Sequence, residues 1–154
     1  MAQIKHPAET ALSTISLSSA ATIVDAALAL GRSSHFKPLT VAVLDAGGHL
    51  VAFKREDSSG ILRPQIAIGK AWGALGMGLG SRVLAQRAQD HPGFYNALNA
   101  ASDGRMFPVP GGVLVRGADK AVIGAVGISG DLPDNDERCA IAGIEQAGLI
   151  ADAG

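Results

Sequence analysis

Two cations and two carboxylates are the residues of this sequence whose types and spacing could do chemistry. Arg63 and Lys70 are seven residues apart, so on a helix they would share nearly one face and could clamp a ligand carboxylate or propionate. Two solvated charges are the alternative, since Lys and Arg are rarely buried. Asp131 and Asp136 lie where a C-terminal helix is expected to begin. Capping and pairing with the helix dipole is the favoured interpretation, and a general base or the partner of a cationic side chain is the alternative.

Glycines near these residues could present backbone N–H groups to a bound anion. Pro110, Gly111 and Gly112 stand where a loop is expected to enter a strand. Such glycines mark either a bulge or a close approach of the chain to a ligand. Gly130 precedes Asp131 just before the last expected helix, and a helix N-terminus can bind an anion. The candidate ligand-binding residues are therefore Arg63, Lys70, Pro110, Gly111, Gly112 and Gly130, and the candidate catalytic residues are Asp131 and Asp136.

Histidine and cysteine give no metal signal. His6, His35, His49 and His91 are not spaced as a local chelating pair, so we expect each at the surface rather than as a ligand. Cys139 is the only cysteine, which excludes an internal disulfide and any site that needs several cysteines. We expect it to be an inert apolar residue and predict no metal site.

Composition limits the class of protein. The chain has 154 residues, 13 Lys+Arg and 14 Asp+Glu, hence a formal charge of 13 − 14 = −1. A single domain of ordinary size is expected, and a charge near zero gives no footprint for nucleic acid or an anionic membrane. The apolar share of 47% excludes general disorder. The apolar runs 20–31 and 121–130 are too short to span a bilayer, and the longer segment 64–81 is interrupted by Lys70. The N-terminus does not resemble a secretory signal, so we expect a cytoplasmic protein.

Periodicity and turn residues predict the elements that must position the candidate site. After a loose arm at 1–12, a helix is expected from Ser18 or Ser19 to Leu30, stopped by Gly31, with the buried stripe Ala20, Val24, Ala27 and Leu28. The remaining expected elements are a hairpin of strands 39–45 and 50–55, a helix over 62–78, a helix over 81–90 capped by Ser81, an irregular or briefly helical stretch over 93–106, a hairpin of strands 113–116 and 121–128, and a helix from about Pro133.

The two hairpins predict one antiparallel sheet flanked by helices, which is an α+β domain covering 1–154.

The helix expected at 62–78 carries regularly spaced glycines, which are unfavourable inside a helix. Gly69, Gly73, Gly76 and Gly80 recur at spacings of four, three and four, although each interior Gly costs about 0.5–1 kcal/mol relative to Ala. We expect another backbone to approach this stripe closely, and a wall for a flat ligand is the alternative.

Four runs of the sequence resemble the GlcG/HbpS-like family, to which the C-terminal domain of PduO-type proteins is related. They are Pro38 to Gly48, Ala67 to Ala71, Pro110 to Val113, and Ile123 to Gly130. The resemblance covers roughly 15–150 and keeps the family's order of motifs. It implies an antiparallel sheet flanked by helices, dimers or higher oligomers, and non-covalent haem binding in some members. No histidine here lies on a matching motif, so the resemblance assigns no haem ligand.

These observations lead to a small cytoplasmic ligand-binding protein that forms a homo-oligomer, with haem as its possible ligand. We expect its pocket between the glycine-bearing helix and the second hairpin. The alternative is a small lyase, isomerase or hydrolase acting on a carboxylate or aldehyde metabolite. In that enzyme Arg63 and Lys70 would hold the anion and Asp131 or Asp136 would move a proton. A third hypothesis is an oligomeric accessory subunit with no site of its own.

Overall fold

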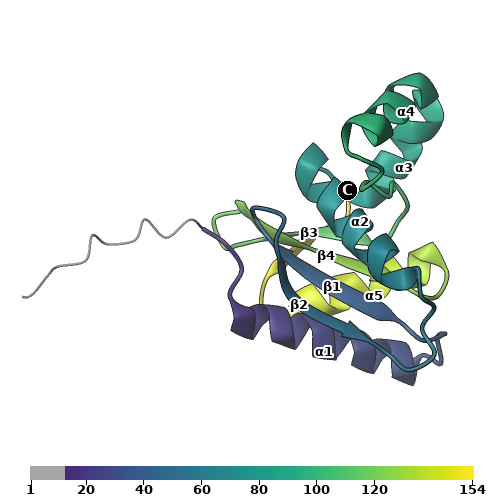
Figure 1. Ribbon diagram of the computed structural model, residues 1–154. Coiled ribbons are helices and arrows are strands. Elements are labelled where there is room, and N and C mark those ends of the chain that lie inside the picture. Colours follow the sequence, from purple (N-terminus) through teal and green to yellow (C-terminus); the bar gives the residue numbers. More distant parts are fainter. Residues whose placement is uncertain (1–12) are drawn as a thin grey trace, which may run out of the picture.

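The computed structural model describes residues 13–154 (Figure 1). The expected arm at 1–12 lies outside this range. Over the described residues, the elements are α1 Leu17–Ser33, β1 Thr40–Asp45, β2 Leu50–Arg55, α2 Arg63–Met77, α3 Ser81–Asp90, α4 Pro92–Ala101, β3 Gly112–Arg116, β4 Val122–Ser129, α5 Pro133–Gln146 and β5 Ile150–Asp152. The order therefore follows the prediction up to the last helix.

The described strands form a single antiparallel sheet in the order β2-β1-β4-β3-β5. Both predicted hairpins are present, and they join where β1 pairs with β4. The first hairpin turns because the Asp45 carboxylate accepts the backbone N–H groups of Gly47 and His49, both at 2.9 Å. Gly48 there has a φ of 83°, which an L side chain adopts at a cost. The predicted α+β class is confirmed.

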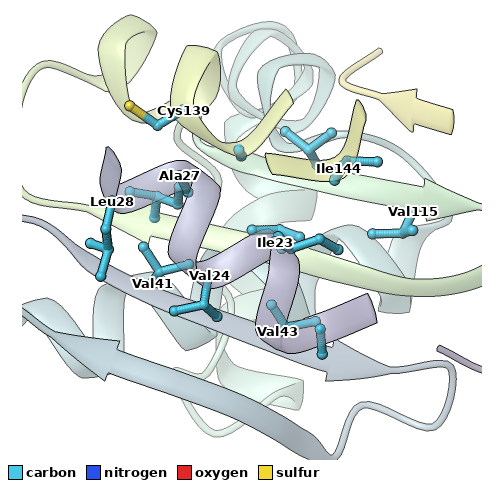
Figure 2. Packing of buried hydrophobic residues seen from close by; sticks show 14 of the residues in the cluster. Ile23, Val24, Ala27, Leu28, Val41, Val43, Val115, Cys139 and Ile144 are labelled. Atoms are coloured by element: carbon cyan, nitrogen blue, oxygen red, sulfur yellow. The ribbon is translucent and has the colours of Figure 1, made fainter. Parts of the chain in front are cut away.

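The helices form a layer on each side of the sheet. Helices α1 and α5 cover one face, α2 covers the other, and α3 and α4 extend beyond α2 away from the sheet (Figure 1). Alternate strand residues point to opposite faces, so Val41 and Val43 join the larger core while Leu44 packs with α2. Figure 2 shows this larger core around Ile23 and Ile144. The predicted buried stripe of the first helix is confirmed, since all four residues are buried.

The first helix begins earlier and ends later than predicted. The Ser16 hydroxyl caps α1 by accepting the N–H of Ser19 at 3.1 Å. The predicted stop at Gly31 is wrong, because α1 continues through Gly31 to Ser33. A Cβ at Gly31 would lie 2.6 Å from the Leu39 side chain, so this glycine serves close packing rather than helix termination.

Two other local predictions need correction, and one strand was missed. Gly80, not Ser81, is the N-cap of α3, because the Ser81 hydroxyl is used to accept the N–H of Gly112 at 2.7 Å. The stretch after α3 is a regular helix, α4, that begins at Pro92, a residue well suited to the first helical position. Strand β5 has three residues and pairs with β3, too short for periodicity to signal it.

The glycine stripe lies where the chain crosses itself, except at one position. A Cβ at Gly69 would lie 2.7 Å from the Arg105 carbonyl oxygen, and one at Gly73 would lie 3.1 Å from the Met106 side chain. A Cβ at Gly80 would collide with the backbone of Ala153. At Gly76 no atom lies within 4 Å. The expected close backbone approach is therefore confirmed at Gly69 and Gly80, whereas Gly73 is approached by side chains only.

Candidate functional site

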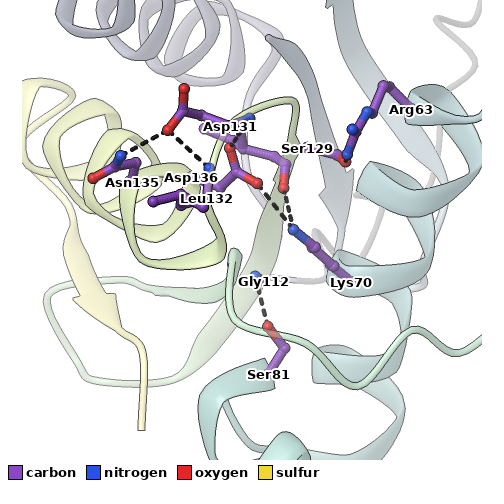
Figure 3. Close-up of polar contacts among 10 residues, drawn as sticks. Arg63, Lys70, Ser81, Gly112, Ser129, Asp131, Leu132, Asn135 and Asp136 are labelled. Atoms are coloured by element: carbon purple, nitrogen blue, oxygen red, sulfur yellow. Dashed lines mark hydrogen bonds and ion pairs between the residues drawn. The ribbon is translucent and has the colours of Figure 1, made fainter. Parts of the chain in front are cut away.

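Lys70 and Asp136 form a buried ion pair between α2 and α5 (Figure 3). Lys70 is 2% exposed and Asp136 is 1% exposed. The Lys70 Nζ donates to the carbonyl oxygen of Ile128 at 2.8 Å and to Asp136 Oδ2 at 3.2 Å. The other Asp136 oxygen accepts the backbone N–H of Asp131 at 3.0 Å. The interpretation of Lys70 as a solvated charge is thus wrong, and the alternative pairing of Asp136 with a cation is confirmed.

Burial perturbs the protonation of this pair. Removal from water lowers the pKa of the Lys70 ammonium below its ordinary value, against the attraction of Asp136. Burial also raises the pKa of the Asp136 carboxyl, although Lys70 opposes that shift. The two proton affinities therefore approach each other, and such perturbed groups are frequent at functional sites. In this conformation, however, both side chains are closed to a substrate.

Arg63 does not share a ligand-facing clamp with Lys70. It is the first residue of α2 and is half-buried. Its Nη1 donates to the Ser129 hydroxyl at 3.1 Å, whereas Lys70 extends to α5 (Figure 3). The helix spacing brought both cations to the same side of α2, but each has a different protein partner.

The predicted glycine turn supports the lysine rather than opening to solvent. Gly111 has a φ of 121°, and a Cβ there would lie 2.8 Å from the Lys70 Nζ. The N–H of Gly112 is donated to the Ser81 hydroxyl, so it is not presented to an anion. Pro110, which precedes them, is half-buried. This turn closes one side of the lysine site.

Gly130 and Asp131 hold the entry to α5. A Cβ at Gly130 would collide with the carbonyl oxygen of Pro38. The Asp131 carboxylate accepts the backbone N–H groups of Lys37 at 2.7 Å and Leu132 at 2.8 Å, and also the side-chain amide of Asn135 at 2.7 Å. The Asn135 bond, followed by the backbone bonds, lowers the pKa of this carboxyl. Asp131 thus holds the loop before α5 as an ionised group, but it does not cap the helix as expected, because Leu132 is the N-cap of α5 and no side chain makes a capping hydrogen bond there.

The pocket expected between α2 and the second hairpin meets a closed contact instead. A Cβ at Gly127 of β4 would collide with the carbonyl oxygen of Ala67, and one at Gly112 of β3 would collide with that of Lys70. Helix α2 therefore lies directly on these two strands. Small residues bring the backbones together and leave no room for a ligand at these points.

Two cavities lie instead along another face of α2. One, of about 290 Å³, is lined by Gln65, Ile68, Gly69, Trp72, Gly104 and Arg105. The other, of about 230 Å³, is lined by Ala46, Gly47, Gly48, Trp72, Leu75 and Gly76. The α2 residues among them recur at spacings of three and four, which places them on one helix face. Trp72 borders both cavities, and we call the pair the Trp72 hollows.

Trp72 is held from two sides. The Arg105 guanidinium lies 4.0 Å from the centre of its ring, a cation–π contact. A Cβ at Gly48 would lie 3.2 Å from the indole, so only a glycine lets the first hairpin approach the ring this closely. The hollows thus have an aromatic wall between a cationic side and the hairpin turn.

His49 lies beside the Trp72 hollows. A Cβ at Gly47, which lines the smaller hollow, would lie 3.0 Å from the His49 Nδ1. That nitrogen is 3.3 Å from Asp45 Oδ1. The imidazole is exposed, as predicted. The Asp45 carboxylate thus lies on the Nδ1 side of the imidazole ring.

Sequence reasoning missed Trp72 and Arg105 and assigned no role to His49. The three-and-four spacing along α2 could have indicated the Trp72 wall, but Arg105 and Gly48 are distant from it in sequence and meet it only through folding. Cys139 is buried, and burial raises the pKa of its thiol to about 11. A thiol with this pKa is a poor nucleophile, in line with the expected inert role.

Over residues 13–154, no three His, Cys, Asp or Glu side chains cluster so as to hold a metal ion. No helix of the same residues is long and apolar enough to cross a membrane.

Several solved structures share this fold. A crystal structure of a PduOC–heme complex matches with a TM-score of 0.80 and 24% identity, over 88% of this chain and 96% of that chain. The Klebsiella pneumoniae protein ORFY matches with a TM-score of 0.81 and 24% identity, over 93% and 97%. HbpS matches with a TM-score of 0.76 and 25% identity, over 91% and 95%.

Sequence comparison assigns the family. A search of curated protein sequences found no match. The family model described as "Haem degrading protein HbpS-like" matches residues 15–145, which include every strand of the two hairpins and nearly all of α5. The chain therefore belongs to the HbpS-like family.

Proposed function

We propose that this protein binds haem non-covalently at the Trp72 hollows, with His49 as the axial ligand. The observation that carries the proposal is the His49–Asp45 pair beside an aromatic-walled hollow. A PduOC–heme complex among the structures of the same fold supports the choice of ligand. The family match supports it as well.

The residues present fit the chemistry of the group. Haem supplies an iron that accepts an imidazole nitrogen as axial ligand. His49 offers such a nitrogen, and Asp45 would orient its ring. Trp72, Leu75 and the glycines offer apolar surface, and Arg105 offers a cation for a propionate.

Haem titration followed by absorbance tests the proposal. The unaltered protein should give a saturable Soret band at a simple ratio of haem to protein. His49→Ala should weaken the apparent affinity by more than about 10–100-fold, which is the usual loss when only the group that orients a metal ligand is removed. His91→Ala is the matched control, because His91 is also exposed but lies at the start of α4.

The possible outcomes separate the two parts of the proposal. If the unaltered protein gives no saturable band, haem binding is wrong. If His49→Ala and His91→Ala both bind as the unaltered protein does, haem binds but His49 is not its ligand.

A second candidate function is favoured by the buried Lys70–Asp136 pair. We infer that an enzyme acting on a carboxylate or aldehyde metabolite could use this pair, with its converging pKa values, for proton transfer. Arg63 would hold the anion at the N-terminus of α2. The backbone N–H of Asp131 would position the Asp136 carboxylate. Two turns would support the Lys70–Asp136 pair. One contains the candidate ligand-binding residues Pro110, Gly111 and Gly112, and the other contains Gly130.

Thermal shift with small carboxylates distinguishes the two candidates. Stabilisation by a carboxylate, with loss of the effect in Arg63→Ala, would favour the enzyme. Stabilisation by haem alone would favour the haem-binding protein. For either function we propose a homo-oligomeric assembly.

A further inference from the structure

Arg105 covers one face of Trp72 at the larger of the Trp72 hollows. Its guanidinium carbon lies 4.0 Å from the centre of the indole ring, which is a contact distance for non-bonded atoms. Both residues line the hollow of about 290 Å³. A flat ligand that stacks on this face of the ring needs the same contact distance. The ligand and the guanidinium therefore cannot occupy the face together.

The backbone of Arg105 is fixed, whereas its side chain is free to leave the ring. The Arg105 N–H is donated to the Ser102 carbonyl at 3.1 Å, and the Phe107 N–H is donated to the Gly69 carbonyl at 3.3 Å. Arg105 itself is exposed, and exposed side chains change rotamer within nanoseconds. The guanidinium can thus uncover Trp72 without a movement of the chain.

The charge of Arg105 has no counterpart around this hollow. The other residues that line it are uncharged, and no carboxylate among residues 13–154 forms an ion pair with Arg105. An anionic group on a ligand would accept charge-assisted hydrogen bonds from the displaced guanidinium. A neutral ligand would displace the guanidinium without this compensation. The hollow therefore distinguishes flat ligands by their charge.

We propose that Arg105 is a charge-selective gate of the Trp72 hollows, which leaves the ring for a flat ligand whose carboxylate it then binds. This inference rests on the proposed function, since haem is a flat ligand that carries propionates. An exposed cation–π contact favours the covered ring by a factor of about two to five. A neutral flat ligand binds more weakly by that factor than it would bind an open ring. Hydrogen bonds to a carboxylate outweigh the contact that they replace.

Titration with naphthoate and naphthamide, substituted at the same ring position, tests the gate. The two molecules are flat and of equal size, but only naphthoate is ionised at neutral pH. Neither carries iron, so neither requires His49. Trp72 is the only tryptophan, and its indole N–H therefore gives a single peak in two-dimensional NMR spectra. The saturable shift of this peak measures both affinities, and the unaltered protein should bind naphthoate more tightly than naphthamide.

Arg105→Ala should change the two affinities in opposite directions. Naphthoate should bind about three- to thirtyfold more weakly, because the charged hydrogen bonds are lost. Naphthamide should bind about two- to fivefold more tightly, because the ring is open. Arg105→Lys keeps the charge and should still favour naphthoate. Arg87→Ala is the matched control, because Arg87 is also exposed but lines neither hollow, and it should bind both molecules as the unaltered protein does.

Fluorescence of Trp72 supplies a readout that needs no ligand. Quenching by acrylamide should increase in Arg105→Ala, because the ring face is uncovered, and should stay unchanged in Arg87→Ala. Equal quenching in Arg105→Ala and the unaltered protein would mean that the guanidinium does not cover the ring, and it would overturn the proposal. Affinities that change in the same direction, or an indole peak that naphthoate does not shift, would also overturn it.

Haem titration separates the gate from the proposed function. A Soret band together with affinities that change in the same direction overturns the gate and leaves haem binding in place. Opposite changes in the two affinities without a Soret band support the gate as a selector of flat carboxylates, and haem binding is then wrong.

Discussion

At the scale of single residues, the Lys70–Asp136 pair is the most unusual feature of the molecule. A second ion pair, Lys54–Asp25, has a shorter N–O distance of 2.7 Å but is exposed, with side-chain exposures of 59% and 63%. Exposed pairs contribute about 0–1 kcal/mol to stability. Removal of one partner of a buried pair leaves an uncompensated charge and costs about 3–5 kcal/mol. Burial, rather than distance, should therefore decide the effect of losing each lysine.

We predict that Lys70→Met lowers the free energy of unfolding by about 3–5 kcal/mol at neutral pH. Lys54→Met, the matched control, should lower it by no more than about 1 kcal/mol. Chemical denaturation of both variants measures the difference. Equal losses would contradict the view that Lys70 stabilises a buried carboxylate.

The loss in Lys70→Met should also depend on pH. Burial already raises the pKa of Asp136 above its unfolded value, and removal of the lysine raises it further. A raised carboxyl pKa gives stability that is present below the unfolded pKa and is lost as the pH rises through the folded pKa. The destabilisation should therefore be smallest in acid and grow toward neutral pH. A loss that stays constant over this range would show that Asp136 remains ionised throughout.

At the scale of elements, the regularly spaced glycines of helix α2 have different effects on stability along its length. Gly69 permits a crossing by the segment 105–107, whose Phe107 N–H is donated to the Gly69 carbonyl at 3.3 Å. Gly76 belongs to the same stripe but faces open space. The first glycine is required by packing, and the second only weakens the helix.

We predict opposite effects of alanine at these two positions. Gly76→Ala should raise the free energy of unfolding by about 0.5–1 kcal/mol, because Ala favours the helix. Gly69→Ala should lower it by about 1–3 kcal/mol, because the new methyl group would press on the Arg105 carbonyl. Urea denaturation of the two variants tests this contrast. Effects of the same sign would mean that segment 105–107 can move away from position 69 without loss of stability.

At the scale of the whole molecule, apolar residues are exposed near the start of α2. Ile61, Leu62 and Leu132 are large, apolar and exposed, and the Arg63–Ser129 hydrogen bond joins the start of α2 to the end of β4, three residues before Leu132. Exposed apolar groups of this kind mark interaction surfaces. We propose that a second copy of the chain covers them in the homo-oligomer.

We predict that Leu62→Ser shifts the protein toward monomer, measured as molar mass by light scattering during size-exclusion chromatography. Leu17→Ser is the matched control, because Leu62 and Leu17 are both 67% exposed but lie at the starts of different helices. The control should keep the mass of the unaltered protein. A monomeric unaltered protein would exclude the homo-oligomer, and loss of assembly in Leu17→Ser alone would move the interface to α1.

The sequence by itself determined the two hairpins and most of the helices, because those features depend on local periodicity and turn chemistry. Strand alternation and the Gly47-Gly48 turn predicted the first hairpin, and the apolar spacing predicted the buried face of α1. It also singled out Lys70 and Asp136 as residues with chemistry. It could not show that they meet, because their contact joins positions 66 residues apart in the chain.

Only the tertiary structure decided which side of α2 is closed and which is hollow. Small residues face both sides of this helix, and their types do not reveal whether a strand, a loop or solvent will face them. The contact with β4 closes one side at Gly127. The approach of Gly48 and Arg105 to Trp72, and the enclosure of the Tyr95 hydroxyl, likewise come from segments distant in sequence. Local propensity carries no information about such long-range contacts, so they emerge only when the whole chain packs.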